Sequence, residues 1–102
     1  MAVRPPRDLR LENGASALDY ELLEEKAAAL GRLGAKAAAA IARLRACQAG
    51  EERPTLVADA AHAVWCYFIQ REVCGLRDHR PVIADLNIPR EVLSRLGAAP
   101  GA

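Results

Sequence analysis

The chain has 102 residues, which is enough for one domain but leaves no room for a second hydrophobic core. Hydrophobic residues make up 52% of the sequence, but 22 residues are alanine and only four are aromatic, so the core must be thin and a partner surface would help to stabilise it. The 14 basic and 13 acidic residues nearly balance, which excludes a strong overall attraction to nucleic acid or to anionic membranes.

No apolar segment follows Met1, and the longest apolar stretch, residues 63–69, is far too short to cross a bilayer. Three cysteines are an odd number and too few for a secreted disulfide scaffold. We therefore expect a cytoplasmic protein with reduced thiols and without a membrane partner.

In chain order, the first expected element is an arm over residues 1–14, which contain two adjacent prolines and end in a glycine. A long helix is then predicted from Ser16, which can form a capping box with Asp19, to about Gln48, with Gly50 ending it. Acidic residues near its start and arginines near its end suit the helix dipole.

A second helix is predicted from near Pro54, a residue suited to the first helical turn, to Cys74, with Gly75 as the left-handed residue that ends it. The short loop between the two long helices makes them antiparallel neighbours. Apolar residues recur at intervals of three and four rather than two, so no strand is predicted.

Two short helices are predicted at the C-terminal end. Asp78 caps the first, which runs to about Leu86, and Pro89 opens the second, which Gly97 stops. The predicted fold class is all-α: a long antiparallel helical hairpin plus two short C-terminal helices, forming a helical bundle as a dimer. The helical domain covers residues 15–97, and a flexible tail covers residues 98–102.

The first long helix has a face of large apolar residues that should pack on the second long helix. We expect this face to meet an apolar face of the second helix. The first face contains Leu22, Leu23, Leu30, Leu33, Ala37, Ile41, Leu44 and Cys47, and the second contains Val57, Ala61, Val64, Trp65 and Phe68.

The opposite side of the first helix has small residues at heptad spacing, which would let a second helix approach closely. Antiparallel pairing with a second copy, in which facing residue numbers sum to 66, would set Glu21 opposite Arg45. The other interpretation is that alanine, the best helix former, simply fills an exposed face. This predicted dimer seam consists of Glu21, Glu24, Ala28, Gly31, Ala35, Ala38, Ala42 and Arg45.

The segment REVCGLRDHRP, residues 71–81, is the densest in polar chemistry, and its candidate functional cluster is Glu72, Arg77, Asp78 and His79. A Cys74–His79 nucleophile pair lacks a third orienting group. A metal site with the spacing H-x3-C-x7-C-x4-H, from His62 to His79, lacks the tight pairs of ligands that metal sites have. We therefore predict no catalytic residue, no metal and no cofactor.

Glu72 falls on the predicted apolar face of the second helix, where a carboxylate must find a partner. Lys26 falls within the leucine face of the first helix, and the hairpin register places it about one turn from Glu72. We predict that Glu72 is buried in a structural ion pair with Lys26; a functional role for the carboxylate is the alternative.

Residues 81–96 resemble a helix-turn-helix at first sight, but Ile88 stands where the turn glycine would be and Pro89 interrupts the start of the second helix. That helix offers only Arg90 and Arg95 for contacts with bases. Weak DNA binding is the third functional hypothesis, and no nucleic-acid partner is expected.

Three segments resemble a group of small bacterial helical proteins that is known only as a domain of unknown function. They are ENGASALDYELLEEKAAALGRLG, VWCYFIQREVCGLRDH and IPREVLSRLG. It covers residues 12–97. The resemblance implies an all-helical soluble protein and brings no activity, cofactor or catalytic residue.

The first functional hypothesis is a non-enzymatic bacterial helical module that forms a homodimer and scaffolds another protein. The second is a small-molecule-binding protein or small enzyme that uses the candidate cluster, Glu72, Arg77, Asp78 and His79. A cavity lined by residues 75–80 would favour the second hypothesis over the first.

Overall fold

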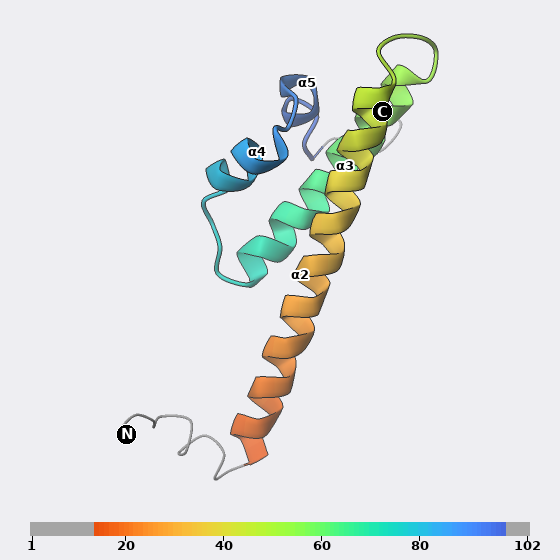
Figure 1. Ribbon diagram of the computed structural model, residues 1–102. Helices are drawn as coiled ribbons and strands as arrows, with labels where there is room; N and C mark the ends of the chain where they lie inside the picture. Colours follow the sequence, from red (N-terminus) through yellow and green to blue (C-terminus); the bar gives the residue numbers. More distant parts are fainter. Residues whose placement is uncertain (1–13, 98–102) are drawn as a thin grey trace.

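The computed structural model describes the backbone of residues 14–97 and the side chains of residues 17–97. This part of the chain forms four helices and no strand, which confirms the predicted all-α hairpin with two short C-terminal helices (Figure 1). The predicted arm lies outside the described residues except for Gly14, the first residue of the long helix, and the predicted tail lies outside them entirely. The helices are α2 (Gly14–Ala46), α3 (Arg53–Val73), α4 (Arg80–Leu86) and α5 (Arg90–Leu93).

Left-handed residues end α3 and α4. Gly75 has a φ of 89°, so that the N–H of Leu76 donates to the carbonyl of Arg71 at 2.8 Å. Asn87 has a φ of 51°, and the N–H of Ile88 donates to the carbonyl of Ile83 at 3.0 Å. Both are the six-to-one hydrogen bonds of a Schellman motif, for which glycine and asparagine are the favoured left-handed residues. The predicted ends of both helices are therefore confirmed.

The helices α2 and α3 pack antiparallel in the predicted register. A Cβ atom built on Gly34 would lie 3.1 Å from ring atoms of Tyr67. At the end of the hairpin away from the loop, the sulfur of Cys74 lies 3.9 Å from the carbonyl oxygen of Lys26. These facing residue numbers sum to 101 and 100, close to the value of 102 expected for a loop centred near residue 51. The buried residues of α2 on this side are Ala37, Ala40, Ile41 and Leu44.

The helix α3 has two packing sides, which corrects the single apolar face predicted for it. Tyr67 and Cys74 lie against α2, as their contacts with Gly34 and Lys26 show. Phe68 instead stacks on His79, and Trp65 lies beside Gly97. The chain after α3 therefore covers a side of this helix that we had assigned to α2. The buried residues that complete the core are Val57, Ala60, Ala61, Val64, Phe68, Val82, Ile88 and Val92.

The N-terminal part of α2 extends past the end of α3 (Figure 1). With 33 residues, α2 is 12 residues longer than α3, a difference of about 18 Å of helix. The radius of gyration is 18.1 Å, against about 13 Å for a compact domain of this length. Leu22 and Leu23, predicted to belong to the packed leucine face, are 50% and 62% exposed because they lie at the edge of the contact with the end of α3.

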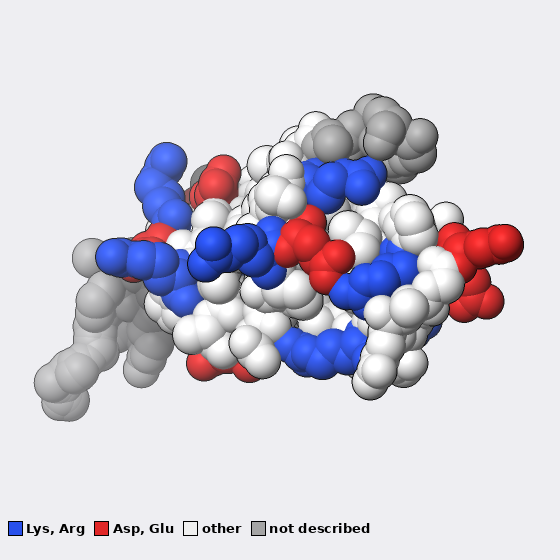
Figure 2. All heavy atoms as spheres, turned by 90° about the horizontal axis from the view of Figure 1, so that it is seen from above, with Lys and Arg blue, Asp and Glu red and all other residues white. Residues whose placement is uncertain are grey.

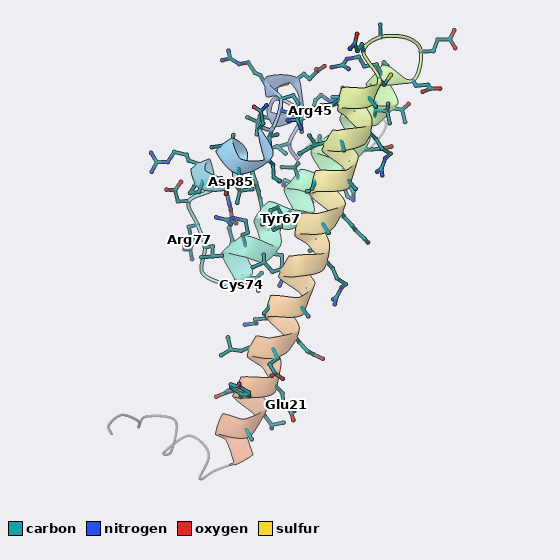
Figure 3. The ribbon with its side chains drawn as sticks, in the orientation of Figure 1. Glu21, Arg45, Tyr67, Cys74, Arg77 and Asp85 are labelled. Carbon is teal, nitrogen blue, oxygen red and sulfur yellow. The ribbon has the colours of Figure 1, made fainter. Side chains whose placement is uncertain are left out.

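Arg45 is directed at the C-terminal end of α4 (Figure 3). Its guanidinium donates to the carbonyl of Leu86 at 3.0 Å and to the carbonyl of Asn87. These carbonyls belong to the last turn of α4, where a cation is favoured. The predicted charge pairing between Glu21 and Arg45 of a second copy would have to compete with these hydrogen bonds.

Candidate functional site

The polar cluster predicted around residues 71–80 forms where α3 ends and the chain turns toward α4. His79 packs face to face on Phe68, with ring centroids 4.1 Å apart and ring planes at 6°. The side chain of His79 is only 15% exposed. The residue immediately before α4 is thereby held against α3.

Two side chains of α3 bind the two ring nitrogens of His79. The Nε of Arg71 donates to Nδ1 at 3.1 Å, so Nδ1 must carry the lone pair. The proton then sits on Nε2, which lies 2.9 Å from a carboxylate oxygen of Glu72. Arg71 also donates through Nη2 to the carbonyl of Asp78 at 2.8 Å. The hydrogen bonds therefore select the neutral tautomer of the imidazole with its proton on Nε2.

The structure corrects the predicted ion pair between Glu72 and Lys26. The carboxylate of Glu72 is 45% exposed rather than buried, and it binds His79. The reason is that Glu72 lies one turn after Phe68 and so continues the side of α3 that meets the C-terminal segment. Lys26 is half-buried on α2, beneath the end of α3.

Asp78 and Arg77 are both exposed in the loop before α4. The carboxylate of Asp78 accepts hydrogen bonds from the backbone N–H of Arg80 at 3.1 Å and from its guanidinium at 2.9 Å. The N-cap position of α4 is His79 rather than the predicted Asp78. Asp78, one residue earlier, instead accepts from the N–H of Arg80, the first residue of the helix. The side-chain and backbone hydrogen bonds from Arg80 lower the pKa of Asp78 to about 2.

A titration of Asp78 should show this lowered pKa directly. The folded pKa of about 2 lies below the ordinary value of 3.8, so these hydrogen bonds contribute fully above pH 3.8 and are lost as the pH falls through about 2. We expect the carboxyl carbon resonance of Asp78 to titrate with a midpoint near 2, and Arg80→Gln to raise the midpoint toward 3.8. Arg90→Gln is the control and should not move it; a wild-type midpoint near 3.8 would contradict the hydrogen bonding described.

The cluster has the arrangement of a structural clamp. Glu72 and His79 bind each other, and Arg71 of α3 donates both to His79 and to the carbonyl of Asp78, so these side chains tie the loop to the end of α3. The predicted members come together except for Arg77, which lies exposed in the loop (Figure 3). Arg71 and Phe68 complete the clamp, and the sequence analysis missed both. Cavities of about 520, 410 and 230 Å³ are lined by residues outside the range 75–80.

The candidate metal ligands and the candidate nucleophile lie apart. Cys66 approaches His62 at 3.6 Å, whereas the sulfur of Cys74 is directed at α2 and His79 lies on Phe68. Among residues 17–97, no group of three or more histidine, cysteine or acidic side chains is placed to hold a metal ion. The structure thus separates Cys74 from His79. The residues spaced as H-x3-C-x7-C-x4-H do not come together as a metal site.

The two short C-terminal helices offer little to DNA. The helix α5, which would be the recognition helix, has four residues, little more than one turn. Figure 2 shows basic and acidic side chains interspersed over the face viewed along the hairpin from its loop end, without a patch of one sign. A DNA-binding surface would normally gather basic residues on one face.

A second candidate surface lies along α2, where the structure leaves two of its sides open. The five small residues of the predicted dimer seam are exposed, and a Cβ atom on Gly31 would meet no atom within 4 Å. On another side, a hollow of about 410 Å³ lies between α2 and Gln70 of α3. We call it the α2 groove, and its lining residues are Leu22, Glu25, Lys26, Ala28, Ala29, Arg32 and Gln70.

Sequence reasoning missed the α2 groove, although the sequence contained a signal for it. Glu25 and Arg32 are seven residues apart, so they lie on the same side of α2 two turns apart. Neither forms an ion pair with another residue of the described range. Opposite charges at this spacing, both open to solvent, can pair with another molecule.

None of the described helices combines the length and apolar character needed to span a membrane. Comparisons with curated proteins and with solved structures gave no match. A family model matches residues 2–102, nearly the whole sequence. The chain with this long hairpin, clamp and open α2 therefore belongs to DUF6665, a family of unknown function.

Proposed function

We propose that the protein is a non-enzymatic helical interaction module of the bacterial cytoplasm that forms a homodimer through α2. The observation that carries this proposal is the N-terminal overhang of α2, defined as residues 17–25. Leu18, Leu22 and Leu23 are 67%, 50% and 62% exposed there. Three leucines within six residues, left uncovered by the rest of the protomer, are typical of a surface that a partner covers.

The charges of α2 favour a second copy as that partner. Residues 17–25 contain four acidic residues and no basic one, whereas residues 26–46 contain five basic residues and no acidic one. Antiparallel association of two α2 helices would bring the acidic part of each copy against the basic part of the other. Parallel association would place like charges together, so the charge pattern also selects the orientation.

The clamp at the end of α3 supports a structural rather than catalytic role for residues 71–80. His79 is bonded through both ring nitrogens and stacked on one face. A general base needs a nitrogen that is free to reach a substrate. The three cysteines are unpaired, which suits a reducing compartment.

Light scattering coupled to size exclusion tests the homodimer. We expect the wild type to have twice the mass of the chain at micromolar concentration. Leu22→Glu should give the monomer mass, because the carboxylate would be buried without a partner in the interface. Leu76→Glu is the matched control: Leu76 is 44% exposed but lies after α3, and this variant should remain a dimer. A wild type that is monomeric at high micromolar concentration would disprove the proposal.

A further inference from the structure

We propose that the twofold axis of the homodimer passes between Ala28 and Ala29, so that the α2 groove of one copy packs against that of the other. This inference rests on the proposed homodimer and specifies its interface. It differs from the seam predicted by sequence in register, because facing residue numbers sum to 57 rather than 66, although Ala28 belongs to both surfaces.

Glu25 and Arg32 lie symmetrically about the position between Ala28 and Ala29, and all four residues line the α2 groove. In an antiparallel twofold pairing centred there, facing residue numbers sum to 57. Glu25 of each copy then faces Arg32 of the other, which gives two equivalent ion pairs. The small side chains of Ala28 and Ala29 at the axis let the two helix backbones approach closely.

The same register matches the charges farther from the axis. Glu21 faces Lys36 of the other copy, and both side chains are exposed in the protomer. Two charge pairs on each side of the axis are self-complementary, as a twofold interface requires. The oppositely charged residues therefore fix the register as well as the orientation of the two helices.

The register also covers an exposed apolar residue of the overhang. Leu22, which lines the α2 groove, faces the small Ala35 of the other copy, and both are exposed in the protomer. Packing of two α2 grooves therefore removes leucine surface from water.

The seam is the competing interface, and the structure weakens its charge pairing. Arg45, which the seam placed opposite Glu21, binds the carbonyls at the end of α4. The two interfaces assign different partners to Glu21: Lys36 in the α2 groove register and Arg45 in the seam. Glu25 has a charged partner, Arg32, only in the α2 groove register, because in the seam register its number pairs with that of Ile41.

A charge exchange between Glu25 and Arg32 tests the groove register. The Kd of dimerisation of the full chain is measured by sedimentation. Glu25→Arg alone, and Arg32→Glu alone, should each raise the Kd of dimerisation by about tenfold or more, because each places two pairs of like charges at the interface. The double variant Glu25→Arg/Arg32→Glu should return the Kd to within about threefold of the wild type. The control, Glu25→Arg/Arg43→Glu, should remain as weak as Glu25→Arg. Circular dichroism should show the same helix content in every variant.

Each other outcome is informative. If Arg43→Glu rescues Glu25→Arg and Arg32→Glu does not, facing residue numbers sum to about 68 rather than 57, and the groove register is wrong. If the wild type is a dimer and no single charge reversal weakens it, the axis does not pass through the α2 groove, while the homodimer itself stands. A monomeric wild type removes the homodimer as well.

Discussion

Replacing Phe68 with alanine is expected to lower the free energy of unfolding by about 3–5 kcal/mol, the usual cost of removing a buried phenylalanine. Phe68 is only 7% exposed, and its ring stacks on His79 at 4.1 Å. The substitution would leave a cavity between α3 and the chain that follows it, and it would remove the surface that orients His79. Since small domains are stable by about 5–15 kcal/mol, this loss is a large share of the total.

Urea denaturation followed by the fluorescence of Trp65, the single tryptophan, measures this change. Leu23→Ala is the control, since it also removes a large apolar side chain, but from a position that is 62% exposed. At a protein concentration that keeps the chain monomeric, it should cost less than about 1 kcal/mol. Equal losses for the two variants would mean that Phe68 is not part of the core.

Gly34→Val is expected to destabilise the hairpin by about 1–3 kcal/mol through overpacking. A Cβ atom at this position would already lie 3.1 Å from two ring carbons of Tyr67, closer than ordinary contact, and valine adds two further methyl groups. The ring of Tyr67 is half-buried, and the guanidinium of Arg71 lies over it at 5.9 Å from the centroid, so a shift of the ring away from α2 would also disturb this contact. The two long helices would have to separate locally.

Gly31→Val provides a matched control in the same helix. A Cβ atom on Gly31 meets no atom within 4 Å, so valine enters open space. Both substitutions replace glycine by valine in a helix, and the change in helix propensity, a few tenths of a kcal/mol, is common to both. The difference between their thermal unfolding curves, measured at a protein concentration that keeps the chain monomeric, is therefore a packing term. Identical curves would contradict the close approach of α2 to Tyr67.

The sequence by itself determined the four helices, the end of α3 and the pairing of the two long helices. Gly75 was identified because few residues other than glycine adopt left-handed backbone conformations without strain. Pro54 marked the start of α3 because proline suits only the first turn of a helix. The short loop fixed the antiparallel register, so that Gly34 meets Tyr67 as the residue numbers require. Each of these features depends on local chemistry or on chain connectivity.

Only the tertiary structure decided which side of each helix meets which neighbour. Apolar residues cover a wide arc of α3, and the sequence does not state that two different segments share this arc. Phe68 and Glu72 therefore faced His79 rather than α2, and the expected pair with Lys26 did not form. Arg45 likewise found carbonyls 41 and 42 residues away in the chain. Such contacts depend on how the segment after Gly75 folds back, which is set by the packing of the whole core and not by any local pattern.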